Sequence, residues 1–242
     1  MLGPFQVLKR PLTLTPKDVK PGPAGSTPAG PVAWWKLDES AGTTTANAAG
    51  KNLAGQIQGQ PRWGPGHNGS GGALEFDGLK NWVEFPDSTS LDFRQGISVS
   101  LWFKVRAFER PAQTLIAKGD AWRLQRQAES GILEFALSGP VTTGTDKNRP
   151  PTVASKRSVD DGKWHHVAAC YDGKRLVLYV DGVEENAVSA SGTLALNSAP
   201  VSLGENDSTP GRLFNGWMDE VRLYACGLTA DQVKPLYQEV KP

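Results

Sequence analysis

Residues 161–182 have the hydrophobic pattern of two β-strands joined by a tight turn. An Asp-Gly pair precedes this stretch, another lies at its centre and a third follows it. Asp-Gly tolerates the positive φ angles of a two-residue hairpin turn, and the residues between the pairs are β-branched, aromatic or apolar. In the second half, successive residues from Leu176 to Val180 fall on opposite faces. We therefore expect a β-hairpin at the centre of the domain.

Ile97–Val105 has the clearest two-residue period in the chain. Val99, Leu101 and Phe103 point to one face, and the residues between them point to the other. We predict that these three side chains are buried together. Shorter strands are predicted at 32–38, 53–58, 73–76, 82–85, 114–118, 122–126, 132–137, 201–203 and 217–224. Residues 73–76 and 82–85 are expected to form a hairpin, and 39–72 is expected to be a long loop apart from 53–58.

A short helix is predicted near the C-terminus, beginning after Thr229. Thr229 is a good N-cap residue, and Gln232 stands at the capping-box position three residues later. Pro235 cannot donate to the carbonyl four residues back, so it should shorten or bend the helix.

Several motifs resemble the laminin-G-like family. They are WHHVAACYDG at 164–173, LVLYVDG at 176–182, FDG at 76–78 with WVEF at 82–85, SVSLWF at 98–103 and FNGWMDEVRLY at 214–224. Five such segments in the expected order cover roughly residues 32–240. The resemblance implies an all-β fold, a two-sheet antiparallel jelly-roll sandwich of the concanavalin A-like type. It also implies an extracytoplasmic protein, secreted or at the cell surface, although this fold carries many functions.

Length and charge fit this assignment. A chain of 242 residues suits one all-β sandwich, here residues 32–242. Lys plus Arg number 26 and Asp plus Glu 25, so no global basic field points to nucleic acid. No apolar run is long enough for a membrane-spanning helix, and the N-terminus lacks the apolar core of a signal peptide. Three explanations for the missing signal peptide stay open: a leader removed earlier, an excised piece of a longer protein, and a cytosolic protein.

Cys170 and Cys226 are expected to be free thiols, with a disulfide as the alternative.

Residues 1–31 differ from the rest of the chain. They hold seven of the 18 prolines and almost no hydrophobic period, which indicates an extended arm or linker. Only Leu12–Thr15 alternates like a strand, and such a strand could pair with a sheet edge of the same or another molecule. Self-assembly through residues 1–31 is therefore a prediction.

Two polar turns are candidates for a calcium site. Asp120 ends one predicted strand, and Glu205, Asn206 and Asp207 follow another. The resemblance places calcium ligands in these loops, and several oxygens converging there would suit a hard cation. Ala121 departs from the related pentraxin pattern, in which an Asn ligand follows. Two solvated turns without metal are the alternative.

A second candidate metal pair is Asp77 and Asp219, which could equally bond turn amides. Trp63 and Trp122 stand beside Gly-rich or charged segments and are candidate sugar-stacking residues, since an indole has an apolar face and a polar edge.

Catalysis is poorly supported by the sequence. Jelly-roll glycoside hydrolases present Glu-x-Asp-x-x-Glu on a strand, whereas the match beginning at Glu205 ends in Pro210 and lies in an expected loop. We therefore predict a non-catalytic module that binds carbohydrate or a protein surface, with calcium possible as a cofactor. The alternatives are a structural building block with the N-terminal arm as connector, and a degenerate glycoside hydrolase.

Overall fold

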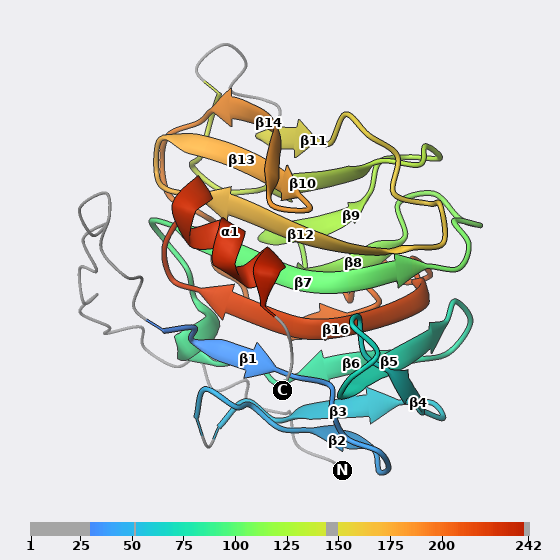
Figure 1. The fold of residues 1–242 in the computed structure, drawn as a ribbon. Helices are drawn as coiled ribbons and strands as arrows, with labels where there is room; N and C mark the ends of the chain where they lie inside the picture. The colour runs from blue at the N-terminus through green and yellow to red at the C-terminus, as the bar shows by residue number, and fades with distance from the viewer. Residues whose placement is uncertain (1–29, 51, 144–149, 240–242) are drawn as a thin grey trace, which may run out of the picture.

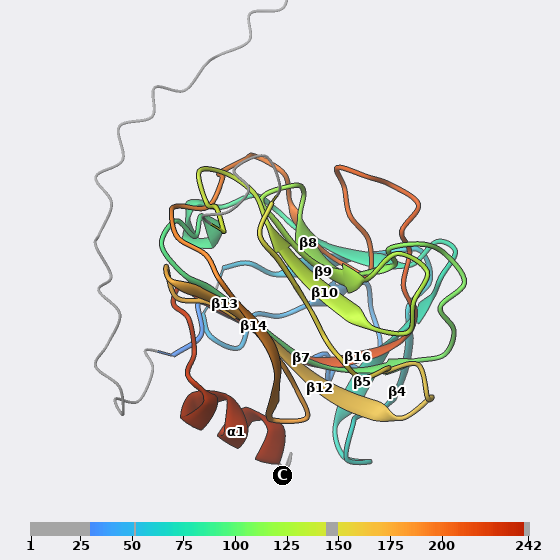
Figure 2. The same ribbon diagram turned by 90° about the horizontal axis from the view of Figure 1, so that it is seen from above.

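The strands form two antiparallel sheets packed face to face, because side chains alternate between the two faces of each strand and one face is apolar. The computed structural model describes residues 30–50, 52–143 and 150–239, and Figures 1 and 2 show the two layers. Sheet A has the order β14-β13-β12-β7-β16-β5-β4, and β1 also pairs with β16. Sheet B has the order β11-β10-β9-β8-β15-β6-β3-β2. The predicted two-sheet antiparallel jelly-roll sandwich is confirmed.

The strands of sheet A are β1 (Ala33–Trp35), β4 (Arg62–Pro65), β5 (Gly72–Asp77), β7 (Ile97–Val105), β12 (Trp164–Tyr171), β13 (Arg175–Val180), β14 (Val183–Ser189) and β16 (Asn215–Tyr224). The strands of sheet B are β2 (Thr44–Thr45), β3 (Gly55–Gln58), β6 (Trp82–Phe85), β8 (Thr114–Lys118), β9 (Trp122–Arg126), β10 (Leu133–Leu137), β11 (Thr152–Ala154) and β15 (Val201–Leu203). A 3-10 turn, η1, spans Thr89–Leu91, and α1 spans Ala230–Gln238.

The core fills the space between the sheets. Val99, Leu101 and Phe103 are all fully buried in it, as predicted. Across the interlayer space Trp35 stacks on Phe85, with ring centroids 3.7 Å apart. Because strand side chains alternate, the opposite face of sheet A points away from this core.

Part of that outer face is covered by α1, which lies against sheet A in Figure 2. A second apolar cluster beneath the helix includes Ala168, Cys170 and Val233. The predicted capping box is present, because Gln232 accepts a hydrogen bond from the Thr229 backbone N–H at 3.0 Å. The helix continues to Gln238, so Pro235 does not end it.

The predicted hairpin of residues 73–76 and 82–85 is wrong. β5 lies in sheet A and β6 in sheet B, so the chain turns a corner between the layers. The Asp77 carboxylate forms this corner by accepting hydrogen bonds from the backbone N–H groups of Leu79, Lys80 and Asn81 at 2.9–3.2 Å. Residues 39–72 also contain more structure than predicted, since β2 and β4 accompany β3 there.

Both cysteines are free thiols in the structure. Residues 1–29 lie outside the described residues. Self-assembly through the arm concerns these residues and stays a prediction. Among the described residues, no helix combines the length and apolar character needed to cross a membrane.

Candidate functional site

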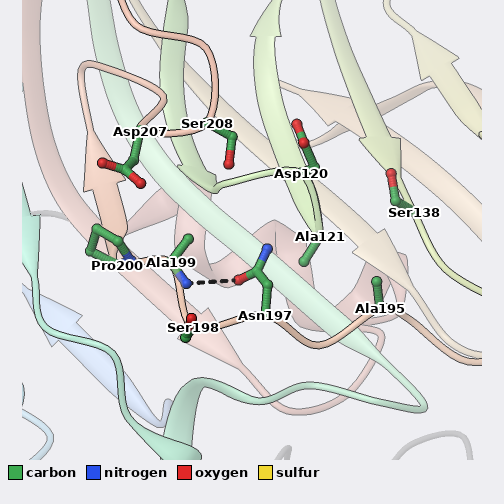
Figure 3. Close-up of a pocket in the computed structure, with 10 residues that line it drawn as sticks. All are labelled: Asp120, Ala121, Ser138, Ala195, Asn197, Ser198, Ala199, Pro200, Asp207 and Ser208. Atoms are coloured by element: carbon green, nitrogen blue, oxygen red, sulfur yellow. Dashed lines mark hydrogen bonds between the residues drawn. The ribbon is translucent and has the colours of Figure 1, made fainter. Parts of the chain in front are cut away.

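An open depression of ≈ 480 Å³ lies where four loops meet at one end of the sandwich (Figure 3). Asp120 enters from the β8–β9 turn, and Asp207 and Ser208 enter from the loop after β15. The remaining lining residues are Ala121, Ser138, Ala195, Asn197, Ser198, Ala199 and Pro200. The lining combines two exposed carboxylates with hydroxyl, amide and small apolar groups, which suits a polar ligand held at the surface.

A buried carboxylate shapes the loop after β15. Glu205 is 9% exposed and accepts hydrogen bonds from the backbone N–H groups of Asn206, Gly211 and Arg212 at 2.8–3.0 Å. Asn206 is fully buried, and its Oδ1 accepts from the Ser208 N–H at 3.0 Å. Both side chains therefore point into their own loop and hold Asp207 and Ser208 at the edge of the depression.

The floor of the depression is held by Asn197 and Lys118. Asn197 Nδ2 donates to the Lys118 carbonyl at 3.2 Å, and Asn197 Oδ1 accepts from the Ala199 N–H at 3.2 Å. The nearly buried Lys118 ammonium donates to the Ala199 carbonyl at 2.8 Å and pairs with Asp87 at 2.5 Å. These contacts tie the 197–200 segment to β8.

The β8–β9 turn and the loop after β15 touch at a glycine. Gly119 has a φ of +49°, and a Cβ there would come within 2.5 Å of Ser208 Oγ. A side chain at this position would therefore be strained and would push the two loops apart.

One protein-family model matches most of this chain. The model described as the Concanavalin A-like lectin/glucanases superfamily, of the laminin-G-like type, matches residues 76–234. The chain belongs to this superfamily. No curated protein matches the sequence.

Solved structures share the fold of this superfamily member at low sequence identity. Domain 4 of AbnA, an extracellular arabinanase from Geobacillus stearothermophilus solved in complex with arabinotriose, aligns with a TM-score of 0.67 and 23% identity. That alignment covers 87% of this chain and 100% of the arabinanase domain.

Toxin binding domains align as well. That of Paraclostridial Mosquitocidal Protein 1 has a TM-score of 0.65 and 14% identity, and covers 86% of this chain. That of Botulinum Neurotoxin DC in complex with SialylT has a TM-score of 0.63 and 14% identity, and covers 88% of this chain. The chain spans about half the length of each, 52% in both cases.

The predicted calcium ligands are only partly brought together. Asp120 and Asp207 line the same depression, whereas Glu205 and Asn206 are engaged inside the loop. Within the described part of the chain, no group of three or more His, Cys, Asp or Glu residues could hold a metal ion. Backbone amides occupy the Glu205 oxygens in this structure, and calcium binding by these residues stays a prediction.

The second candidate pair is also separated. Asp77 lies opposite Asn215 on β16, four residues from Asp219, so the two backbones are roughly 13 Å apart along the strand. Asp219 is buried against His67, whose Nδ1 lies 2.8 Å from Asp219 Oδ2. These two carboxylates cannot share one metal ion.

Neither predicted sugar-stacking residue offers a free ring at this site. Trp122 is 1% exposed and packs in the core near Phe93, so the prediction of an exposed ring there is wrong. Trp63 lies on β4, and its partly buried ring packs against the core. The depression instead uses Asn197 and Ser138, which carry no charge or aromatic ring that would have marked them in the sequence.

Replacing Glu205 with glutamine should lower the free energy of unfolding by about 1.5–3 kcal/mol, because one of two acceptor oxygens becomes a donor facing backbone N–H groups. Urea denaturation in the presence of a chelator measures this change. Asp207→Asn on the same loop is the matched control, since its side chain is exposed and should change stability by less than about 0.5 kcal/mol. A loss for Glu205→Gln seen only with calcium present would instead make Glu205 a metal ligand.

Proposed function

We propose that this chain is a non-catalytic module that binds carbohydrate in the depression between Asp120, Asn197 and Asp207. The observation that carries the proposal is the open, polar depression built from loops on a rigid sandwich. Carboxylates and amides on such loops can hydrogen-bond sugar hydroxyls without enclosing the ligand. The arabinotriose and SialylT complexes of the structural neighbours support this choice of ligand class.

The non-catalytic part of the proposal rests on the arrangement of the acids. Hydrolysis of a glycosidic bond normally needs two carboxyl groups held in place on either side of the bond. Glu205 is committed to three backbone amides, and Asp120 and Asp207 are exposed on separate loops. We also propose an extracytoplasmic location, supported by the extracellular arabinanase among the neighbours.

Calcium remains a proposal, now carried by Asp120 and Asp207 alone. Two exposed carboxylates supply few of the six to eight oxygens that the ion prefers, so a site formed by them would be weak. Its role would be to neutralise the two carboxylates and to order their loops around a sugar.

A glycan array probed with the full chain, once with calcium and once with chelator, tests the function. We expect binding to a defined set of glycans, with Asp207→Ala reducing the signal about tenfold because a charged hydrogen-bond partner is lost. Glu129→Ala, on an exposed turn outside the depression, is the control and should bind like the wild type. Equal binding by wild type and Asp207→Ala would place the ligand elsewhere. An array without signal would contradict carbohydrate binding altogether, and equal signals with calcium and chelator would remove calcium from the proposal.

A further inference from the structure

A continuous row of side chains crosses five strands on the outer face of sheet A, and none of its members lines the loop depression. Strand register places its members directly opposite one another, in the order Trp164, Lys104, Trp217, Glu75 and Arg62. The row runs across β12, β7, β16, β5 and β4, which is four strand spacings or roughly 19 Å. We call it the indole row.

The ring of Trp217 packs against a glycine on β4. A Cβ built on Gly64 would come within 2.7 Å of the indole carbon Cζ3, so the ring extends from β16 across β5 and packs against the Gly64 backbone on β4. The backbone of Gly64 does not have a positive φ, so the close ring, and not the turn conformation, requires glycine there. The indole is half-buried and supported from beneath by the sheet.

Trp164 forms the other aromatic position of the row. Its half-buried ring meets the His67 ring edge to face, with centroids 6.5 Å apart. Among the described residues, the indole N–H groups of Trp164 and Trp217 have no partner, and neither is a buried unsatisfied group. Both rings therefore offer an apolar face and an accessible hydrogen-bond donor.

Lys104 lies between the two tryptophans and carries an unpaired charge. Within the described chain its ammonium forms no ion pair and no cation–π contact. Glu75, the carboxylate of the row, pairs with Arg106. Arg62 is exposed and also has no ion-pair partner among the described residues. The free charges in the row itself are thus positive.

Other side chains on this face of sheet A are covered by α1 or packed against neighbouring rings. Trp102 lies between the rings of His67 and Tyr237, with centroids 4.1 and 5.6 Å away. In Figure 1, α1 crosses the left and central part of sheet A and does not reach the right-hand ends of β12 and β7. The indole row lies at those ends, since it includes the first residue of β12 and the penultimate residue of β7.

We propose that the indole row is a second glycan-binding surface, specific for sugars that carry a carboxylate, such as a uronic acid polymer. This inference rests on the proposed function as a carbohydrate-binding module and adds a site and a ligand class to it. The two indoles stack on the apolar faces of two sugar rings, and the Lys104 ammonium pairs with a carboxylate held between them. The length of the row suits an extended chain that crosses the strands.

Affinity electrophoresis and calorimetric titration with polygalacturonate, with a neutral glucan as comparison, test the proposal. We expect the wild type to prefer the polyuronate, and Trp217→Ala to weaken binding about tenfold through loss of the stacking surface. Trp217→Tyr should keep most of the affinity, because it retains a flat ring. Lys104→Gln should weaken polyuronate binding about threefold to fivefold and remove the preference over the neutral glucan. Melting temperatures confirm that each variant is folded.

Asp207→Ala separates this proposal from the one above, because it alters the loop depression and leaves the indole row intact. Polyuronate binding that is lost in Asp207→Ala but unchanged in Trp217→Ala and Lys104→Gln overturns the indole row and leaves the loop depression as the site. Glycan binding by the wild type that does not include polyuronate overturns the carboxylate specificity. A chain that binds no glycan in either experiment overturns both proposals.

Discussion

Replacing Leu101 with alanine should lower the free energy of unfolding by about 2–5 kcal/mol, the range found when a large aliphatic side chain is removed from a packed core. Leu101 is fully buried in the middle of β7, which pairs with β12 on one side and β16 on the other. It lies opposite Val167, which is also fully buried. The strands on both sides are fixed by their ladders, so the cavity should collapse only partly.

Chemical denaturation monitored by tryptophan fluorescence measures this loss. Lys104→Ala is the matched control, because it lies in the same strand but on the outer face and should cost less than about 0.5 kcal/mol. Similar losses for both variants would mean that strand propensity, and not core packing, sets the stability of β7.

The sequence predicted the strands whose two faces have different environments. In β7, Leu101 faces the core and Trp102 faces outward, so the hydrophobic pattern has a two-residue period. β13 shows the same division, with Leu178 in the main core and Tyr179 in the cluster beneath α1. Where the layers impose such a difference, local sequence contains enough information to place a strand.

Sheet membership was not predictable from the same pattern. The turn after β5 has the Asp-Gly chemistry of a hairpin, yet Asp77 uses its carboxylate to make a corner between the layers. Whether the next strand pairs locally or crosses to the other sheet depends on partners distant in sequence. β6 pairs with β15 and β3, and neither partner is adjacent to it along the chain.

The candidate site in the loop depression was predicted only in part, and the reason is related. A carboxylate in a loop can bind a cation, bind a sugar or accept backbone hydrogen bonds, and its sequence context looks the same in all three cases. The structure shows that Glu205 accepts backbone hydrogen bonds while Asp207 stays exposed, although the two lie two residues apart. The sequence placed the half-buried Trp217 in a strand. It did not identify Trp217 as part of a binding surface, because only the register between β16 and β7 shows that Trp217 lies beside Lys104.

The second large effect is expected at His166, a buried histidine outside both proposed sites. Its Nε2 lies 2.9 Å from Ser100 Oγ, and its Nδ1 has no hydrogen-bond partner among the described residues. Burial, helped by the nearby positive charge of Arg222, lowers the pKa of His166 to about 3. The side chain is therefore neutral in the folded protein at pH values where a solvated histidine is protonated.

This difference makes stability depend on pH. Between pH 6.5 and about 3 the unfolded chain binds a proton at His166 that the folded chain does not bind, so the free energy of unfolding falls as the pH falls. Each pH unit below 6.5 corresponds to about 1.4 kcal/mol, which gives about 2 kcal/mol at pH 5.

His165 and Asp161 act mainly outside this window. The pKa of His165 is raised, chiefly by its hydrogen bond to Asp181, so its contribution is fully present below pH 6.5 and is lost only as the pH rises through the folded value. The backbone N–H of Lys163 and the other partners lower the pKa of Asp161 to about 2, so this carboxylate loses its contribution mainly below about pH 5. The interval from pH 5 to 6.5 therefore reports on His166 more than on these groups.

Urea denaturation at half-unit steps between pH 5 and 7.5, on the wild type and on His166→Gln, tests this expectation. The wild type should lose about 2 kcal/mol between pH 6.5 and 5, while His166→Gln, whatever its absolute stability, should lose much less over the same interval. His165→Gln is the matched control on the same strand and should keep the wild-type slope below pH 6.5. Parallel curves for the wild type and His166→Gln would show that His166 takes up its proton in the folded state. That result would require the side chain to be hydrated or paired with an acid, and neither is compatible with its fully buried position against Ser100 and Trp102.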